Sequence, residues 1–247
     1  MANTRIYLWS HPRSLSTVFL RSFEQRDDTK TFLEPLLMNY NPNMGPVKDI
    51  PTSHFMDLKK QLELQDTHPI TFVNEHLFVF ETFLDNDNFH DFVMKDAVHT
   101  FIIREPQESV LSYSKVKHAP TPFRPEEVLI ENYSVLVNKL QSNGSKIIII
   151  NATELLKNPT QVLIKYCADC GIPFLETMMN WKVAEEDSVY RTNSDWFGVV
   201  ADSTGFIKFD EQKALEAANW QNIKFTNVLQ RNKVVFRDLQ KWFPTYS

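Results

Sequence analysis

The segment that decides the fold is IYLWSHPRSLST, residues 6–17. Its first four residues are large and apolar, as in a buried strand, and the spacing from Leu15 onward predicts a helix that reaches about Arg26. A polar turn with Arg13 at its centre lies between them. Amides at a helix N-terminus, the helix dipole and nearby hydroxyls together favour a phosphate or another tetrahedral anion. An ordinary strand-to-helix turn closed by a capping serine has the same pattern, so the rest of the chain has to decide.

Strand-like segments alternate with helical ones along the chain. Further strands are expected at residues 70–74, 98–103 and 146–150, with a short extended segment at 31–36. The expected helices span residues 53–65, 77–84, 106–117, 126–140, 159–170 and, in one or two pieces, 211–242, while residues 176–205 are expected to be irregular. This alternation predicts an α/β fold with a parallel sheet covered by helices on both faces, formed by a single domain over residues 1–247.

Polar residues follow several of the predicted strands. Ligands of such folds bind at the carboxyl ends of the strands, where the chain offers the turn at residues 10–17, Glu75 with His76, Arg104, and Asn151. These four places are the candidate site.

Composition narrows the class of partner. The chain has 247 residues, is 43% hydrophobic, and carries a net charge of -5 with a sequence pI of about 5.8. An acidic balance disfavours a general nucleic-acid binder, so local groups must hold any anionic ligand. We see no apolar run of membrane-spanning length and no secretory signal, and we therefore expect a cytoplasmic protein without a membrane partner.

The only two cysteines, Cys167 and Cys170, are spaced CxxC. That spacing suits a redox site or half of a zinc site. There is no second pair, however, and the surrounding segment is typical of an amphipathic helix closed by Gly171. We interpret both cysteines as core residues, and we expect no metal site because no His/Cys/Asp cluster has ligand spacing.

The turn at residues 10–17 lacks the signature of common nucleotide loops. The phosphate loop GxxxxGK[ST] needs glycines and a lysine, but the first glycine of the chain is Gly45 and no lysine precedes Ser16 or Thr17. GxGxxG is absent as well. An ordinary P-loop kinase or hydrolase and a dinucleotide site are therefore disfavoured.

The turn resembles the 5′-phosphosulfate loop of the sulfotransferases, whose common form is YPKSGTT where this chain has HPRSLST at residues 11–17. Three further segments are similar to that family. Arg104 ends a strand and Ser112 follows eight positions later, like the pair that holds the 3′-phosphate of the family's donor. The VNEHL segment at 73–77 is similar to the one that supplies the catalytic histidine, and residues 150–173 resemble the late strand and helix. Together the matches cover roughly residues 4–175.

The resemblance implies a P-loop-like three-layer fold and a sulfotransferase that uses 3′-phosphoadenosine 5′-phosphosulfate (PAPS), releases the desulfated product PAP and needs no metal. His76 is then the general base, and Arg13 offsets charge on the leaving oxygen. The implied donor-binding residues are Arg13, Ser14, Leu15, Ser16 and Thr17 at the 5′ end, with Arg104 and Ser112 at the 3′-phosphate.

The chain departs from the family pattern inside the loop. Arg13 replaces the usual lysine, and Leu15 replaces a glycine, from which we expect that the loop needs no positive φ at this position. His11 is the second candidate for the base. The other histidines, His99 among them, are expected to be solvated or structural.

The acceptor is expected to be a small molecule with a hydroxyl or an amine. Glu34, Glu75 and Glu105 near the proposed cleft are consistent with a cationic or amine acceptor, and equally with an ordinary charged rim. Two alternatives to a sulfotransferase stay open: a catalytically inactive nucleotide-binding protein of the same fold, and a P-loop nucleotide kinase or hydrolase.

Overall fold

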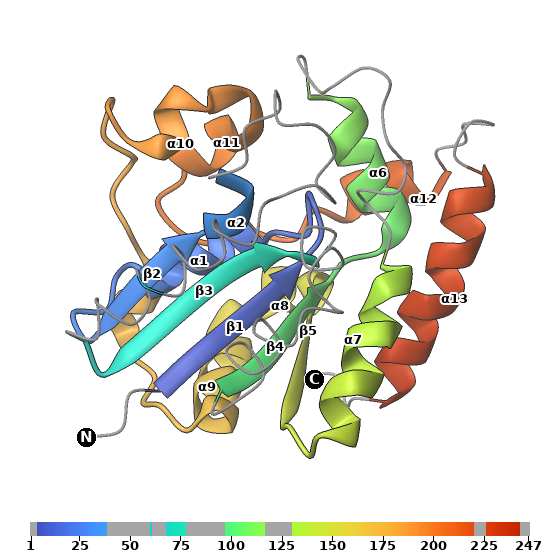
Figure 1. The fold of residues 1–247 in the computed structure, drawn as a ribbon. Helices are drawn as coiled ribbons and strands as arrows, with labels where there is room; N and C mark the ends of the chain where they lie inside the picture. The colour runs from blue at the N-terminus through green and yellow to red at the C-terminus, as the bar shows by residue number, and fades with distance from the viewer. Residues whose placement is uncertain are drawn as a thin grey trace.

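The computed structural model describes residues 4–38, 60, 68–77, 97–116, 130–219 and 226–242. Its centre is a five-stranded sheet in the order β2-β3-β1-β4-β5, in which every neighbouring pair is parallel (Figure 1). The strands are β1 (Thr4–Ser10), β2 (Thr29–Leu33), β3 (Ile70–His76), β4 (Ala97–Ile103) and β5 (Ile147–Asn151). The predicted α/β class and parallel sheet are confirmed.

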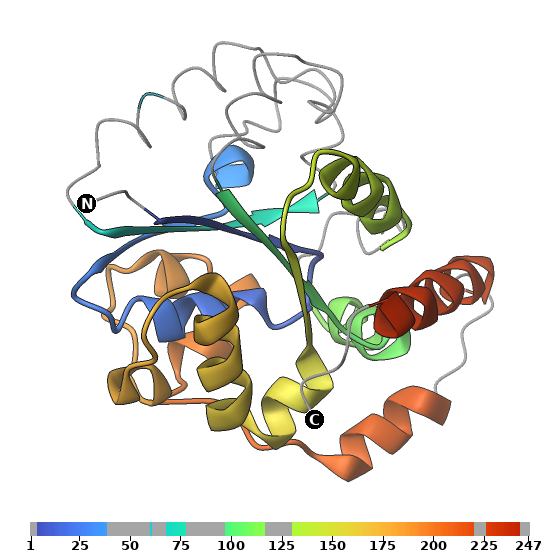
Figure 2. The same cartoon turned by 90° about the horizontal axis from the view of Figure 1, so that it is seen from below.

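Helices cover both faces of this sheet (Figure 2). One face packs against α1 (Ser16–Phe23), α8 (Ala152–Lys157) and α9 (Pro159–Cys170), and the other against α7 (Glu131–Ser142) and α13 (Thr226–Trp242). Alternation along β1 explains the two layers, because Ile6 and Leu8 belong to the first core and Tyr7 and Trp9 to the second.

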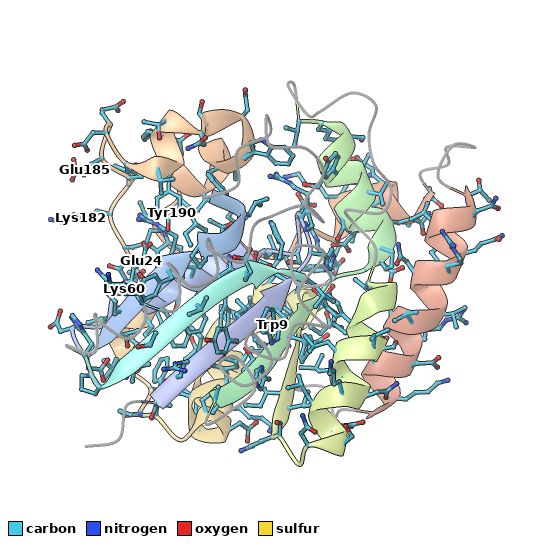
Figure 3. All side chains as sticks on the ribbon, in the orientation of Figure 1. Trp9, Glu24, Lys60, Lys182, Glu185 and Tyr190 are labelled. Carbon is cyan, nitrogen blue, oxygen red and sulfur yellow. The ribbon has the colours of Figure 1, made fainter. Side chains whose placement is uncertain are left out.

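Trp9 shows how the second core satisfies its polar groups. Its Nε1 donates to Nδ1 of His99 at 3.0 Å, and the rings of Tyr7, Trp9 and His99 are stacked in parallel planes (Trp9 is labelled in Figure 3). His99 is fully buried on β4. The prediction that this histidine is structural is confirmed.

Helix α9 matches its predicted bounds, because Pro159 starts it and Gly171 ends it in the left-handed region at φ 74. Cys167 and Cys170 are free and buried in the core beneath the sheet. Burial raises the pKa of the two thiols to about 11 and about 12, respectively. This confirms them as core residues.

Several predicted boundaries were wrong. The first helix ends at Phe23, and the extended segment predicted at 31–36 is instead the strand β2 followed by a short helix, α2 (Pro35–Met38). The helix predicted at 106–117 is α6 (Pro106–Ser114) and ends three residues early. The C-terminal helical region predicted at 211–242 in one or two pieces is confirmed, as α12 (Glu211–Asn219) and α13. The helices predicted at 53–65 and 77–84 lie outside the described residues except at Lys60 and Leu77.

The segment at 176–205 is partly helical, contrary to the prediction. It forms η5 (Glu176–Met179), α10 (Val189–Thr192) and α11 (Ser194–Ala201). The side chains of Tyr190, Phe197 and Ala201 pack together in one buried cluster. They are spaced as on a helix, but the chain breaks between α10 and α11 at Asn193, so the sequence pattern does not indicate one continuous helix.

Helices α10 and α11 lie at the same end of the sheet as the carboxyl ends of the strands (Figure 1). They are tied to α1, because the guanidinium of Arg21 lies 4.9 Å from the ring centre of Tyr190 and donates to the carbonyl of Lys182 at 2.6 Å. The Tyr190 hydroxyl donates to the carboxylate of Glu24 (Figure 3). No helix among the described residues is long and apolar enough to cross a membrane.

Candidate functional site

The loop at residues 11–15 turns the chain sharply from β1 into α1. Two of its residues have left-handed backbones, Arg13 at φ 68 and Leu15 at φ 75. The expectation that position 15 needs no positive φ was therefore wrong. Leu15 accepts the first helical bond from Phe19 N at 3.1 Å while its partly buried side chain packs on the core beside α1. The turn keeps the backbone shape that suits glycine, at a cost of about 1–2 kcal/mol for each non-glycine residue.

Ser14 marks the inside of this loop. Its side chain is fully buried, its Oγ has no hydrogen-bond partner among the described residues, and its amide donates to the carbonyl of His11 at 3.2 Å. Ser16 and Thr17 form the first turn of α1, where amides have no carbonyl within the helix to donate to. A buried hydroxyl without a partner is costly, so the loop suits a ligand with acceptor oxygens.

Two arginines meet beside the loop. Arg13 Nε donates to Ser112 Oγ at 3.0 Å, and its Nη1 donates to the carbonyl of Trp196 on α11 at 2.7 Å. Arg104 Nη1 donates to the carbonyl of Arg13 at 2.9 Å, and its Nε to Glu108 Oε2 at 2.9 Å. The sequence paired Arg104 with Ser112; the structure brings all three residues together but sets Ser112 against Arg13.

The two guanidiniums make one basic corner. Burial and the neighbouring charge of Arg104 lower the pKa of Arg13. Neither arginine uses its Nη2 nitrogen on a described residue. The carboxylate of Glu108 is the counter-charge that pairs with Arg104.

His11 is built into the scaffold. Its Nδ1 lies 3.2 Å from the hydroxyl of Tyr133 on α7, and its Nε2 lies 3.1 Å from Ser109 Oγ on α6. Burial, with the charges of His76 and Arg104, lowers its pKa to about 3. These two contacts fix the loop to α7 and α6, and the lowered pKa makes His11 a poor proton acceptor near neutrality.

His76 ends β3 and is buried. Its Nε2 lies 3.2 Å from Glu34 Oε1, and its Nδ1 lies 3.0 Å from Ser10 Oγ on β1. Burial alone lowers the pKa of His76, but the carboxylate of Glu34, helped by Glu75, outweighs burial and raises it above the ordinary value of 6.5. Sequence analysis named Glu34 as an acidic residue near the cleft but not as the ion-pair partner of this histidine.

Backbone strain gathers at these same residues. Arg13, Leu15 and Glu34 are the three non-glycine residues with positive φ in the described chain, and Glu34 has φ 44. The amide of Glu34 donates to the carbonyl of Asn74 on β3 at 2.8 Å, which fixes its carboxylate beside His76. Strained backbones persist where the surroundings over-determine them, typically at functional sites.

The family of the chain follows from a match over most of its length, because residues 4–218 fit the family model described as a sulfotransferase domain (Sulfotransfer_5). The chain belongs to the sulfotransferase-domain family. The matched residues include the loop, His76 and both arginines.

One curated relative of this sulfotransferase-domain protein is Branched-chain-amino-acid aminotransferase-like protein 2 of Arabidopsis thaliana, 29% identical over 213 residues. The alignment covers 81% of this chain and 36% of the relative, so the chain spans about a third of that protein.

Solved structures agree on the fold. The sulfotransferase domain of the Synechococcus PCC 7002 olefin synthase superposes with a TM-score of 0.59 at 12% identity, covering 95% of this chain and 96% of that one. Mouse sulfotransferase SULT7A1, solved with PAP, gives 0.51 at 16% identity, covering 97% and 89%. At these identities the likeness shows the fold alone.

The donor that the sulfotransferase family implies carries phosphates at both the 5′ and the 3′ position. The residues present fit such a ligand. Ser14 Oγ, which has no partner among the described residues, and the amides at the start of α1 suit one phosphate, and the Arg13 guanidinium with the Ser112 hydroxyl suits another. Among the described residues, no three His, Cys, Asp or Glu side chains gather as metal ligands would.

Proposed function

We propose that this protein transfers the sulfuryl group of PAPS to a hydroxyl or amine of a small molecule, by in-line displacement with His76 as general base. The observation that carries the proposal is the juxtaposition, at one edge of the sheet, of an anion loop with a buried His–Glu pair. The first suits a leaving phosphate and the second suits an acceptor proton. PAP in the structure of a protein with this fold supports the choice of donor.

In this proposal the loop binds the 5′ end of the donor. The amides of Leu15, Ser16 and Thr17 and the Ser14 hydroxyl donate to the 5′-phosphate, and the charge of Arg13 offsets the charge that builds on the leaving oxygen. Arg104 and Ser112 bind the 3′-phosphate and so select PAPS over ATP. A phosphate beside Ser112 would meet the Arg13 guanidinium as well, which strengthens that position.

The acceptor proton goes to the His76–Glu34 pair. As the acceptor oxygen or nitrogen bonds to sulfur, the bond from sulfur to the 5′-phosphate oxygen breaks, and the acceptor releases one proton to the pair. Because Glu34 raises the pKa of His76, a fraction of the enzyme is protonated near neutrality. Turnover should therefore rise with pH, with its acidic limb above 6.5.

The acidic residues favour a cationic or amine-bearing acceptor. Glu34 lies against His76, and Glu75 Oε1 accepts from the His76 amide at 2.8 Å, so two carboxylates flank the proposed base. Glu105 instead immediately precedes α6, where Lys233, Glu108 and Arg237 are its charged neighbours. In this proposal, Glu34 and Glu75, and not Glu105, would attract a cationic acceptor toward His76.

The test is to incubate the protein with PAPS and a mixed pool of alcohols, phenols and amines, with chelator present, and to detect sulfonated products by mass. We expect product, its loss in His76→Ala, and nearly unchanged PAP affinity in that variant. His68→Ala, which changes a histidine at the opposite end of β3, is the control and should keep turnover. Turnover retained in His76→Ala would remove His76 as the base.

The alternatives predict different results. A catalytically inactive binding protein would bind PAP without metal yet give no product from any acceptor. A nucleotide kinase or hydrolase would consume ATP and depend on Mg²⁺. Thermal stabilisation by PAP and not by ATP, with chelator present, would contradict the second alternative.

A further inference from the structure

The backbone carbonyl of Arg13 accepts a hydrogen bond from a residue outside the loop. Because a peptide bond is normally trans, this carbonyl points opposite to the Ser14 amide, which donates to the carbonyl of His11 at 3.2 Å. Arg104 Nη1 donates to the Arg13 carbonyl at 2.9 Å. One charge-assisted hydrogen bond thus fixes the peptide plane that sets the direction of the following amides.

Glu108 fixes the arginine that makes this bond. It lies on α6 four residues after Arg104 and accepts from Arg104 Nε at 2.9 Å. Both side chains are largely buried, at 17% and 13% exposure. A carboxylate repels phosphate, so electrostatics alone gives no reason for one beside an anion site. The geometry of the pair explains why Glu108 is there. Because the guanidinium is planar and rigid, the bond from Nε to Glu108 orients the whole group and directs Nη1 toward the Arg13 carbonyl.

We propose that Arg104 is a positioning residue for the anion loop: it acts on the 5′-phosphate through the backbone of Arg13, with Glu108 fixing its orientation. This role is additional to the proposed contact with the 3′-phosphate, which Nη2 of Arg104 can make. It rests on the proposed function only in its choice of nucleotide as the ligand. Arg13 and Leu15 have left-handed backbones that their residue types disfavour, so an interaction from outside the loop is needed to stabilise this conformation.

The test compares two ligands, PAP and adenosine 5′-phosphate, which lacks the 3′-phosphate. If Arg104 positions the loop, Arg104→Ala should weaken both about tenfold or more, the usual effect of losing one charge-assisted hydrogen bond. Arg104→Lys restores the charge but not the fork, so it should recover part of the preference for PAP without recovering the affinity for adenosine 5′-phosphate. Glu108→Gln keeps an acceptor oxygen for Nε and should keep loop order.

A second readout needs no nucleotide. Hydrogen exchange of the amides at residues 14–17 should accelerate about tenfold in Arg104→Ala, while the amides of α9 keep their wild-type rates. Arg191→Ala is the matched control, because Arg191 also bonds a backbone carbonyl, that of Ala184, and a carboxylate, that of Asp202. It should leave loop exchange and both affinities unchanged.

The outcomes separate this proposal from the proposed function. Weaker PAP binding with unchanged affinity for adenosine 5′-phosphate and unchanged loop exchange would overturn the positioning role and leave only the 3′-phosphate contact. Accelerated loop exchange in a protein whose wild type binds neither nucleotide would support the positioning role and count against the proposed function.

Discussion

Leu15 provides a direct test of the backbone of the anion loop. Position 15 caps α1 in the left-handed region, at φ 75 and ψ 14, and its side chain is only partly buried. Replacing it by alanine removes packing and keeps the strain. Replacing it by glycine removes the same packing and the strain together. We therefore predict that Leu15→Gly is more stable than Leu15→Ala, the reverse of the order expected in a helix.

The magnitude follows from two opposing free energies. A left-handed backbone costs alanine about 1–2 kcal/mol more than glycine. Glycine has the freer unfolded chain, which costs it about 0.4–1 kcal/mol. The difference leaves Leu15→Gly ahead by about 1 kcal/mol, which corresponds to roughly 2–4 °C in Tm for a chain of this size.

The assay is urea unfolding of both variants, with the same pair at Leu215 as the control. Leu215 lies inside α12 and is 57% exposed, so Leu215→Gly should be less stable than Leu215→Ala by about 1 kcal/mol. The glycine-minus-alanine difference should thus have opposite signs at the two positions. If glycine costs as much at position 15 as at position 215, the left-handed cap is wrong.

Two further predictions concern buried polar groups of the loop. As pH falls from 6.5 toward 3, the unfolding free energy should drop by up to about 1.4 kcal/mol per pH unit, because the unfolded chain binds a proton that buried His11 does not. Denaturant titrations should show that the unfolding free energy of His11→Gln depends less on pH over this range. An equal pH dependence in the variant and the wild type would contradict the buried neutral ring. Ser14→Ala should leave the unfolding free energy unchanged or slightly higher, because it removes an unpartnered buried hydroxyl, yet should weaken PAP binding severalfold by calorimetry. A Ser14→Ala variant that is clearly less stable than wild type would show that the hydroxyl has a partner.

The parallel sheet and the places of the candidate site residues at its edge could be predicted from the sequence, because they depend on local patterns. Apolar runs marked the strands, and polar residues after them marked the carboxyl edge where Arg13, His76 and Arg104 lie. Glu108 could have been found as well, since it stands four positions after Arg104 in a predicted helix. The Arg13–Ser112 contact could not, because it depends on the left-handed φ of Arg13.

Long-range partners were the other part that sequence could not give. The contact between Arg13 and the Trp196 carbonyl joins residues 183 positions apart, and no motif marks a backbone carbonyl as an acceptor. The Glu34–His76 pair forms only if β2 and β3 are neighbours in the sheet, and the order of strands in the sheet cannot be read from local sequence patterns. Leu15 shows the limit of reasoning from residue preference, because the turn imposes a backbone that leucine disfavours.

The parallel register of β1 and β3 places Ser10 opposite His76 and Trp9 opposite Glu75. Because neighbouring residues of a strand face opposite sides of the sheet, inserting a single residue within β3 would exchange the imidazole for a carboxylate beside the loop. Insertions in the connection between β2 and β3 leave that pairing untouched. An insertion between α2 and β3 can therefore lengthen the chain without moving His76 away from Ser10 or Glu34.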